Sequence, residues 1–313
     1  MKPAPDADSW RTTATGLPAN VYLGTSSWSF PGWEGIVYGA KHSKTLLSRE
    51  GLSAYAKHPL LRSVGVDRTF YAPIAREEFA AYRARVPDSF RFLVKAFEGV
   101  TTPRWPRHRR YGERAGSVNE HFLDPKLALE HVVAPARDGL GGTLGVLLFQ
   151  FPPHAPQEVD GSEGFAERLE RFFRALPDDV PYAVEIRTRP LLAKPYADAL
   201  SLVGVDHGFV HHPRMPSISE QRACVGLPTR VGAVRWMLGG GRKYDEAKEA
   251  FAPFNRRAAP DAETLGEIAR LVDDMVPRVP VMVVVNNKAE GSAPLSVRAL
   301  AQRLAANGQP PSE

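Results

Sequence analysis

Short apolar runs and amphipathic stretches alternate along the whole chain. Runs of about four to eight residues rich in Val, Leu and Phe have the length of buried strands, whereas apolar residues recurring every three or four positions indicate helices. The predicted strands cover residues 21–23, 63–71, 91–96, 144–151, 182–186, 203–205, 233–237 and 281–285. The predicted helices cover residues 44–57, 74–85, 124–136, 165–176, 191–200, 261–275 and 295–306.

This order is a run of eight strand-then-helix units, of which the unit between residues 203 and 233 is the least regular. Alternation of this kind favours an α/β fold with a parallel sheet. Eight such units in about 300 residues predict a single (β/α)8 TIM-type barrel. The main rival is an open doubly wound sheet, but its nucleotide sites require a glycine-rich loop after the first strand, and the sequence has none there.

The predicted strands share a polarity: they are apolar early and polar late. Active sites of (β/α)8 barrels lie at the carboxyl-terminal ends of the strands, so this bias predicts a site at that rim. Two residues, Glu185 and Lys95, are the candidate catalytic groups. The candidate substrate-binding residues are Ser26, Trp28, Thr69, Tyr71, Gln150, Arg187, Asp206, Arg235, Asn286 and Asn287.

The stretch PYAVEIRTRP, residues 181–190, contains the strongest part of this signal. Glu185 and Arg187 are two residues apart in a buried strand, so both project to the same face. Burying two charges is unfavourable unless each of them is hydrogen-bonded. The pair is therefore either an internal ion pair that only stabilises packing or part of a functional site.

Composition limits the class of protein. The chain has 313 residues, a formal charge of +5, a pI of about 9.3 and 43% hydrophobic residues, as is ordinary for a globular enzyme. The single cysteine, Cys224, excludes an internal disulfide. With neither a secretory signal nor an apolar run long enough for a transmembrane helix, we expect a cytoplasmic protein without a membrane partner. We expect residues 1–20 to be a flexible extension, residues 21–306 the barrel domain and residues 307–313 a flexible tail.

Six blocks of sequence occur in an order that resembles the YecE-like proteins, the domain of unknown function 72. They read GTSSWSFPGW, RTFYAP, FRFLVKA, LLFQFPP, VEIR and VVVNNKAEGSAP, and the resemblance covers about residues 21–304. It implies a single TIM-type barrel and a site at the matching positions, but no reaction. The chain departs from the family pattern at Gly65, Asp67 and Thr188. If a second carboxylate is needed, Asp67 or Asp206 would have to supply it.

The candidate residues favour acid/base chemistry by Glu185 on a small anionic substrate. Lys95, Arg187 and Arg235 are suited to holding phosphate or carboxylate oxygens, as a lyase, isomerase or hydrolase would require. Lys95 could instead attack a carbonyl or form a salt bridge to Glu185. We predict neither a metal nor a cofactor, because the three cations would crowd a metal bound near Glu185.

Two alternatives remain open. The same pocket could hold a metabolite without catalysis, or the protein could process nucleic acid, using the basic loop 104–114. The longer segment 101–117 is a polar loop, and we predict that it covers the mouth as a mobile lid.

Overall fold

Eight parallel strands close into a barrel in the computed structural model, which describes residues 1–239 and 241–307. The strands are β1 Val21–Thr25, β2 Ser63–Val66, β3 Arg91–Lys95, β4 Leu144–Gln150, β5 Tyr182–Glu185, β6 Asp206–His211, β7 Gly232–Trp236 and β8 Val281–Val285. Each strand pairs with the next, and β8 returns to pair with all five residues of β1. The predicted (β/α)8 barrel is therefore confirmed.

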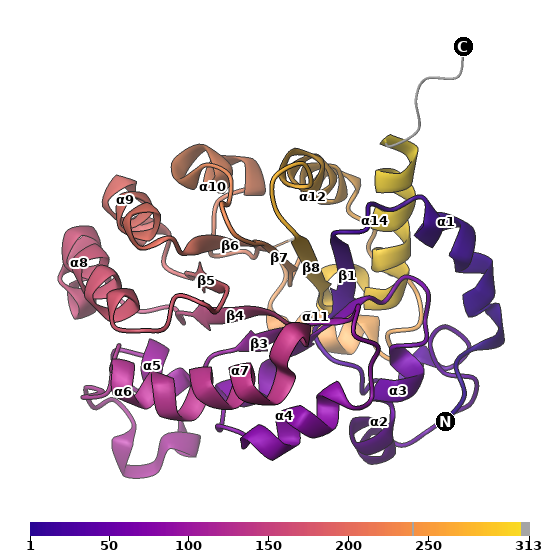
Figure 1. Ribbon diagram of the computed structural model, residues 1–313, viewed down its shortest axis with the longest axis horizontal. Coiled ribbons are helices and arrows are strands. Elements are labelled where there is room, and N and C mark those ends of the chain that lie inside the picture. Colours follow the sequence, from indigo (N-terminus) through magenta and orange to yellow (C-terminus); the bar gives the residue numbers. More distant parts are fainter. Residues whose placement is uncertain (240, 308–313) are drawn as a thin grey trace.

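The larger helices surround the barrel, as Figure 1 shows for α8, α9, α10, α12 and α14. The helices are α1 Arg11–Thr15, α2 Lys44–Glu50, α3 Leu52–Tyr55, α4 Arg76–Arg83, α5 Glu98–Thr101, α6 Pro125–Ala128, α7 Ala134–Leu140, α8 Gly161–Arg174, α9 Lys194–Val203, α10 Ile218–Val225, α11 Tyr244–Phe251, α12 Ala262–Met275, α13 Asn287–Glu290 and α14 Ala293–Asn307. The sequence reading missed α10 and α11, and it merged α2 with α3. None of the helices in the described residues is long and apolar enough to cross a bilayer.

The barrel interior changes from apolar to charged along its axis. Leu93, Leu148, Ala183 and Ala233 belong to one buried cluster inside the barrel. Because successive side chains in a strand alternate between faces, the residue two positions after each of these also points inward. Those positions are occupied by Lys95, Gln150, Glu185 and Arg235. The predicted polar rim thus forms at the carboxyl-terminal end of the strands.

Strand β2 is shorter than predicted. It ends at Val66, and residues 67–70 form a 3-10 turn. The Thr69 hydroxyl contacts two backbone carbonyl oxygens, those of Val66 at 2.7 Å and Lys95 at 2.6 Å. The predicted strand over residues 63–71 is therefore too long, because the chain turns at Asp67.

The sixth strand lies later in the chain than predicted, and this moves one candidate residue. Val203 ends α9, and Gly204 terminates that helix with a φ of 64°, a conformation that favours glycine. Strand β6 then begins at Asp206. Asp206 consequently lies at the amino-terminal end of the barrel, opposite the rim at which we expected it.

The first residues of the chain pack against the barrel rather than extending from it. Trp10, Ala14 and Leu17 are buried, and the Trp10 ring stacks edge-on against His58, with 4.6 Å between ring centres. Helix α1 lies beside α14 (Figure 1), where the guanidinium of Arg298 covers the Trp10 ring. This differs from the loose extension expected for residues 1–20. Of the predicted tail, Asn307 ends α14 and residues 308–313 lie outside the described residues.

Asp206 has a structural role that can be tested. Its buried carboxylate accepts hydrogen bonds from the backbone N–H groups of Thr229, Arg230 and Val231, at 2.7–2.9 Å. Asp206→Ala leaves these donors without an acceptor, so we expect a loss of about 1–3 kcal/mol in the free energy of unfolding, measured in urea. Asp206→Asn retains one oxygen and should lose less. Unchanged stability in the alanine variant would contradict this role.

Candidate active site at the barrel mouth

Five charged side chains meet at the carboxyl-terminal mouth of the barrel. Lys95 ends β3, Glu185 ends β5, and Arg235 lies near the end of β7. Asp67 directly follows β2, and Arg187 lies two residues after the end of β5. Strands β5 and β7 are not neighbours, so the closure of the barrel brings these residues together across its interior.

Glu185 is the centre of this charge cluster. It is completely buried (0% exposed), and one of its oxygens accepts a hydrogen bond from Nε of Arg187 at 2.6 Å. Nη1 of Arg235 donates to both carboxylate oxygens, at 3.0 and 3.2 Å. Burial acts to raise the pKa of Glu185, but the positive charges of Arg187, Arg235 and Lys95 outweigh it and lower the pKa to about 2. The carboxylate is therefore ionised at neutral pH.

Arg235 joins Glu185 to a second carboxylate. Its Nη2 donates to both oxygens of Asp67, at 3.3 and 3.4 Å. Its Nε is buried and has no hydrogen-bond partner among residues 1–239 and 241–307. Of the two residues that the sequence offered as a second carboxylate, Asp67 lies in the cluster and Asp206 does not.

Lys95 is the cation without a carboxylate partner. Its Nζ lies 3.6 Å from the centre of the Phe70 ring, and it forms no ion pair within 4.0 Å with any carboxylate in the described part of the chain. The salt bridge to Glu185 that the sequence allowed is thus absent. Burial lowers the pKa of Lys95 to about 7: the nearby Arg235 and Arg187 act in the same direction, while Asp67 and Glu185 oppose it.

Gln150, Ser26 and Asn286 occupy the same rim. Gln150 stands opposite Glu185 in the β4–β5 register, and its amide forms no hydrogen bond to a residue that the structure describes. Asn286 donates to the Ser26 hydroxyl at 3.4 Å, while its own oxygen accepts from the backbone N–H of Lys288. Gln150 is therefore the least constrained polar side chain of the three.

Other predicted binding residues have structural partners. Trp28 is buried against Tyr82 with ring centres 5.3 Å apart, and its indole N–H donates to the carbonyl of Ser48. The Asn287 oxygen accepts from the Trp33 indole at 3.2 Å and from the Ala293 N–H at 2.8 Å. Thr69 connects the ends of β2 and β3 as described above. These side chains support the rim and do not face its charges.

His212 is a further residue near the charge cluster, and it is not among the candidates selected from the sequence. A Cβ atom placed on Gly208 of β6 would lie 3.4 Å from the Glu185 Cβ, so this face of the strand is directed at the charge cluster. His212 comes four residues later, on the same face of the chain. Burial and then the charge of Arg187 lower the pKa of His212 to about 3, so its ring is neutral. Its Nδ1 accepts from the N–H of Arg214, which leaves Nε2 as the protonated nitrogen. The alternation along β6 was the signal that could have identified it.

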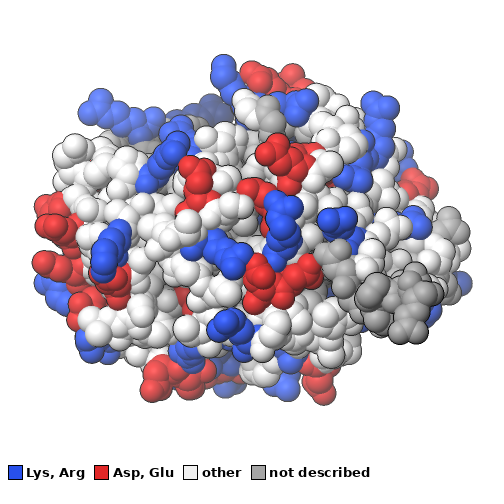
Figure 2. Space-filling view, turned by 90° about the horizontal axis from the view of Figure 1, so that it is seen from above, with Lys and Arg blue, Asp and Glu red and all other residues white. Residues whose placement is uncertain are grey.

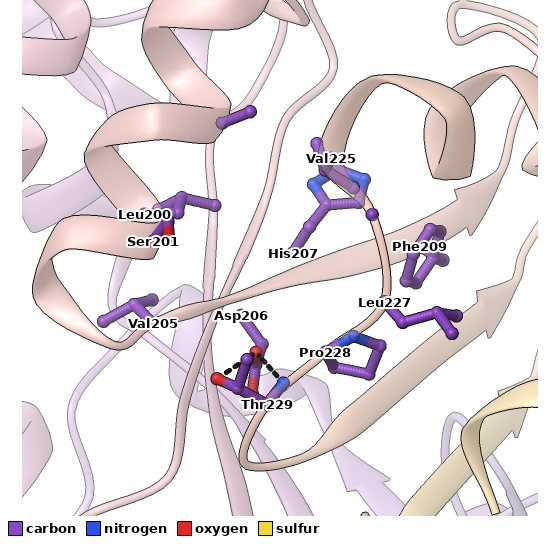
Figure 3. Close-up of a pocket in the computed structure, with 12 residues that line it drawn as sticks. Leu200, Ser201, Val205, Asp206, His207, Phe209, Val225, Leu227, Pro228 and Thr229 are labelled. Atoms are coloured by element: carbon purple, nitrogen blue, oxygen red, sulfur yellow. Dashed lines mark hydrogen bonds between the residues drawn. The ribbon is translucent and has the colours of Figure 1, made fainter. Parts of the chain in front are cut away.

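A small cavity of about 90 Å³ lies elsewhere, between α9 and α10. Figure 3 shows Asp206 and Thr229 at one end of it, joined by hydrogen bonds, and His207 above them. The His207 ring is satisfied by the Tyr196 hydroxyl at 2.8 Å and the Gln221 oxygen at 3.2 Å. This cavity is separate from the charge cluster at the mouth.

The basic loop is held by contacts within the chain. Arg110 pairs with the buried Glu98 at 2.6 Å, and the Tyr111 hydroxyl donates to the same carboxylate at 2.9 Å. Arg104 pairs with Glu158 at 3.1 Å. Glu98 also interacts electrostatically with Lys95, so the loop is anchored next to the charge cluster. Its predicted mobility as a lid stays a prediction.

Comparison with known proteins identifies the family. The family model described as "Protein of unknown function DUF72" matches residues 22–313. The chain belongs to the DUF72 family. The UPF0759 protein YunF of Bacillus subtilis (strain 168) is 27% identical over 290 residues, covering 87% of this chain and 90% of that protein. The resemblance noted in the sequence is thereby confirmed.

Solved structures of DUF72 proteins share the fold of this chain. The protein from Thermotoga maritima MSB8 gives a TM-score of 0.59 at 20% identity, covering 91% of this chain and 98% of that one. The protein from Enterococcus faecalis V583 gives a TM-score of 0.57 at 14% identity, with 91% and 97% coverage. At these identities the likeness concerns the fold alone.

In this DUF72 protein, the two carboxylates at the mouth are hydrogen-bonded to arginines and not to each other. Both oxygens of Glu185 and both of Asp67 contact Arg235. No group of three or more His, Cys, Asp or Glu side chains in metal-binding proximity occurs in the described residues. The chemistry that these residues can supply directly is anion binding and proton transfer.

The burial of Glu185 predicts a large effect on stability. Glu185→Gln removes the charge that two buried guanidiniums share, and breaking a buried pair costs about 3–5 kcal/mol. We expect a corresponding fall in the free energy of unfolding, measured in urea. Glu50→Gln is the matched control, because Glu50 pairs with Arg49 on the surface and should change stability little. The structural role of Glu185 fails if both variants unfold alike.

Proposed function

We propose that this DUF72 protein is an enzyme that binds a small phosphate- or carboxylate-bearing molecule at the barrel mouth and transfers a proton to or from it. The observation that carries the proposal is the unequal pairing of charges. Three cations face two carboxylates, and Glu185 is shared between two of the cations. Lys95 has no carboxylate within ion-pair distance in the described residues, so a cation remains for an anionic ligand.

Arg187 supplies a second donor for the same anion. It uses Nε and Nη2 to contact one oxygen of Glu185, and its Nη1 has no hydrogen bond to a described residue. Guanidinium groups suit phosphate and carboxylate because their parallel N–H groups match two oxygens. Arg235 is more enclosed and bonded to both carboxylates, so its part is to shape the cluster rather than to meet the ligand first.

Lys95 is better suited than Glu185 to carry the proton. A catalytic acid or base works best when its pKa lies near the operating pH. Burial brings the pKa of Lys95 to about 7, whereas the pKa of Glu185 is about 2 and its protonated form is scarce at neutral pH. Glu185 holds the two arginines in place, and Gln150 is positioned to orient a carbonyl or hydroxyl group.

The nucleic-acid alternative has less support. Arg104 and Arg110 of the basic loop are already paired with Glu158 and Glu98, and Arg114 lies over the Trp105 ring. On the face shown in Figure 2, Lys and Arg side chains are interspersed with Asp and Glu rather than gathered by sign. Polynucleotide binding without sequence preference usually relies on a continuous basic surface.

Sulfate binding tests the anion site, because sulfate stays a dianion across the pH range used. Lys95 carries its charge below its pKa, so sulfate affinity should be highest below pH 7 and fall as the pH rises through 7. We expect Lys95→Met to weaken sulfate about tenfold and to remove this pH dependence, as measured by calorimetry at constant ionic strength. Lys194→Met changes an exposed lysine and is the control. Equal sulfate affinity in wild type and Lys95→Met would overturn the site.

Proton transfer can be tested separately from binding. The protein is incubated in D2O with phosphorylated ketoses or keto acids, and NMR measures deuterium at the carbon next to the carbonyl. We expect the wild type to incorporate deuterium there. We expect Lys95→Met to abolish incorporation, because Lys95 is the group whose pKa burial brings to about 7. Incorporation that persists in Lys95→Met would assign the proton to another residue. Anion binding without any incorporation would support the non-catalytic alternative.

A further inference from the structure

An exposed aromatic ring stands at the edge of the charge cluster. Tyr71 is 60% exposed, and Tyr244 is the other large aromatic side chain of the described residues that is exposed to this extent. It directly follows the turn that ends β2, and thus lies at the carboxyl-terminal rim between β2 and β3. Exposed aromatic surface beside a polar site is a common feature of ligand-binding regions.

Short contacts connect Tyr71 to the buried amine. The Lys95 Nζ lies 3.6 Å from the centre of the Phe70 ring, and the Phe70 and Tyr71 ring centres are 5.3 Å apart. These two distances placed end to end are the upper limit of the separation between the amine and the Tyr71 ring. A ligand of ordinary metabolite size can therefore contact both groups.

The Tyr71 ring is held in place from the loop side. The Arg110 guanidinium lies over it, 4.9 Å from the ring centre, and Arg110 is itself fixed by the ion pair to Glu98. A cation over one face of an aromatic ring is a stabilising contact that restrains the ring. Tyr71 is thus a pre-positioned aromatic surface that no side chain of the described residues covers fully.

We infer that the mouth takes a nucleotide, with its phosphate at Lys95 and Arg187 and its base against Tyr71. This inference rests on the proposed anion site and adds the class of ligand. Aromatic side chains stack on the planar faces of nucleobases with little dependence on the base. The sugar of a nucleotide separates base from phosphate by several ångströms, a spacing compatible with a ring at the rim and an amine below it.

A second exposed tyrosine provides a matched control. Tyr244 is also 60% exposed, lies on the segment that follows β7, and has the Lys288 ammonium 4.1 Å from its ring centre. The ring of Tyr71 contacts the Phe70 ring, which in turn contacts Lys95. Tyr244 has no such ring contact to Phe70 among the described residues. The two tyrosines thus share exposure and a cationic neighbour but differ in their connection to the anion site.

The test compares AMP with ribose 5-phosphate, which carries the same phosphate without a base. By calorimetry we expect wild type to bind AMP about tenfold more tightly than ribose 5-phosphate, as one stacked base would give. Tyr71→Leu should abolish this difference without changing the affinity for ribose 5-phosphate. Tyr71→Phe keeps the ring and should retain most of the difference, and Tyr244→Leu should retain all of it.

The outcomes separate this inference from the proposed function. Equal binding of AMP and ribose 5-phosphate by wild type would overturn the nucleotide inference while leaving the anion site standing. An AMP preference that survives in Tyr71→Leu would also overturn it, as would a preference lost equally in Tyr244→Leu. If sulfate, ribose 5-phosphate and AMP all fail to bind, the anion site and the inference fall together.

Discussion

The shared carboxylate of Glu185 is the interaction on which the mouth of this barrel depends. Two guanidiniums inside a closed sheet repel each other, and burial removes their hydration. An anion between them compensates for both unfavourable effects. Glu185 supplies that anion from β5, where it meets Arg187 on its own side of the barrel and Arg235 from β7. Asp67 then neutralises the far side of Arg235. Each arginine thus has a carboxylate partner, whereas Lys95 has none within ion-pair distance among the described residues.

The strand register determines why these groups meet. Lys95, Glu185 and Arg235 each follow an inward apolar residue by two positions, so the apolar layer that closes the barrel also sets the height of these charges. Gly208 contributes because it has no side chain. A Cβ atom at this position would lie 2.8 Å from the Leu148 side chain and 3.4 Å from the Glu185 Cβ. The charged layer is therefore a consequence of barrel packing as much as of electrostatics.

The sequence predicts the barrel and the charged layer well because both depend on local patterns. Strand β8 falls on the predicted residues 281–285, and the pair Glu185 and Arg187 stands out by its two-residue spacing. Asp206 was misplaced because the short apolar run 203–205 covers the end of α9 and the residues just before β6, and Gly204 was the overlooked stop signal. The structural partners of Trp28 and Asn287 could not be foreseen, because residue type does not reveal which face of the backbone a side chain occupies. The N-terminal segment was missed although Trp10, Ala14 and Leu17 have helical spacing.

A packing ion pair at Glu185 is compatible with the proposed site beside it. Since Glu185 is fully buried and bonded to two guanidiniums, it has the partners expected of a structural pair. The same pairing neutralises both arginines in part, which lets Lys95 stay close to them. Burial and the residual positive charge then bring the lysine to a pKa of about 7. If the group in place of Glu185 carried less negative charge, the arginines would repel the Lys95 ammonium more strongly and lower its pKa further. A carboxylate bonded directly to Lys95 would have the opposite effect and raise its pKa. The amine of Lys95 and the structural pair are two parts of one charge balance.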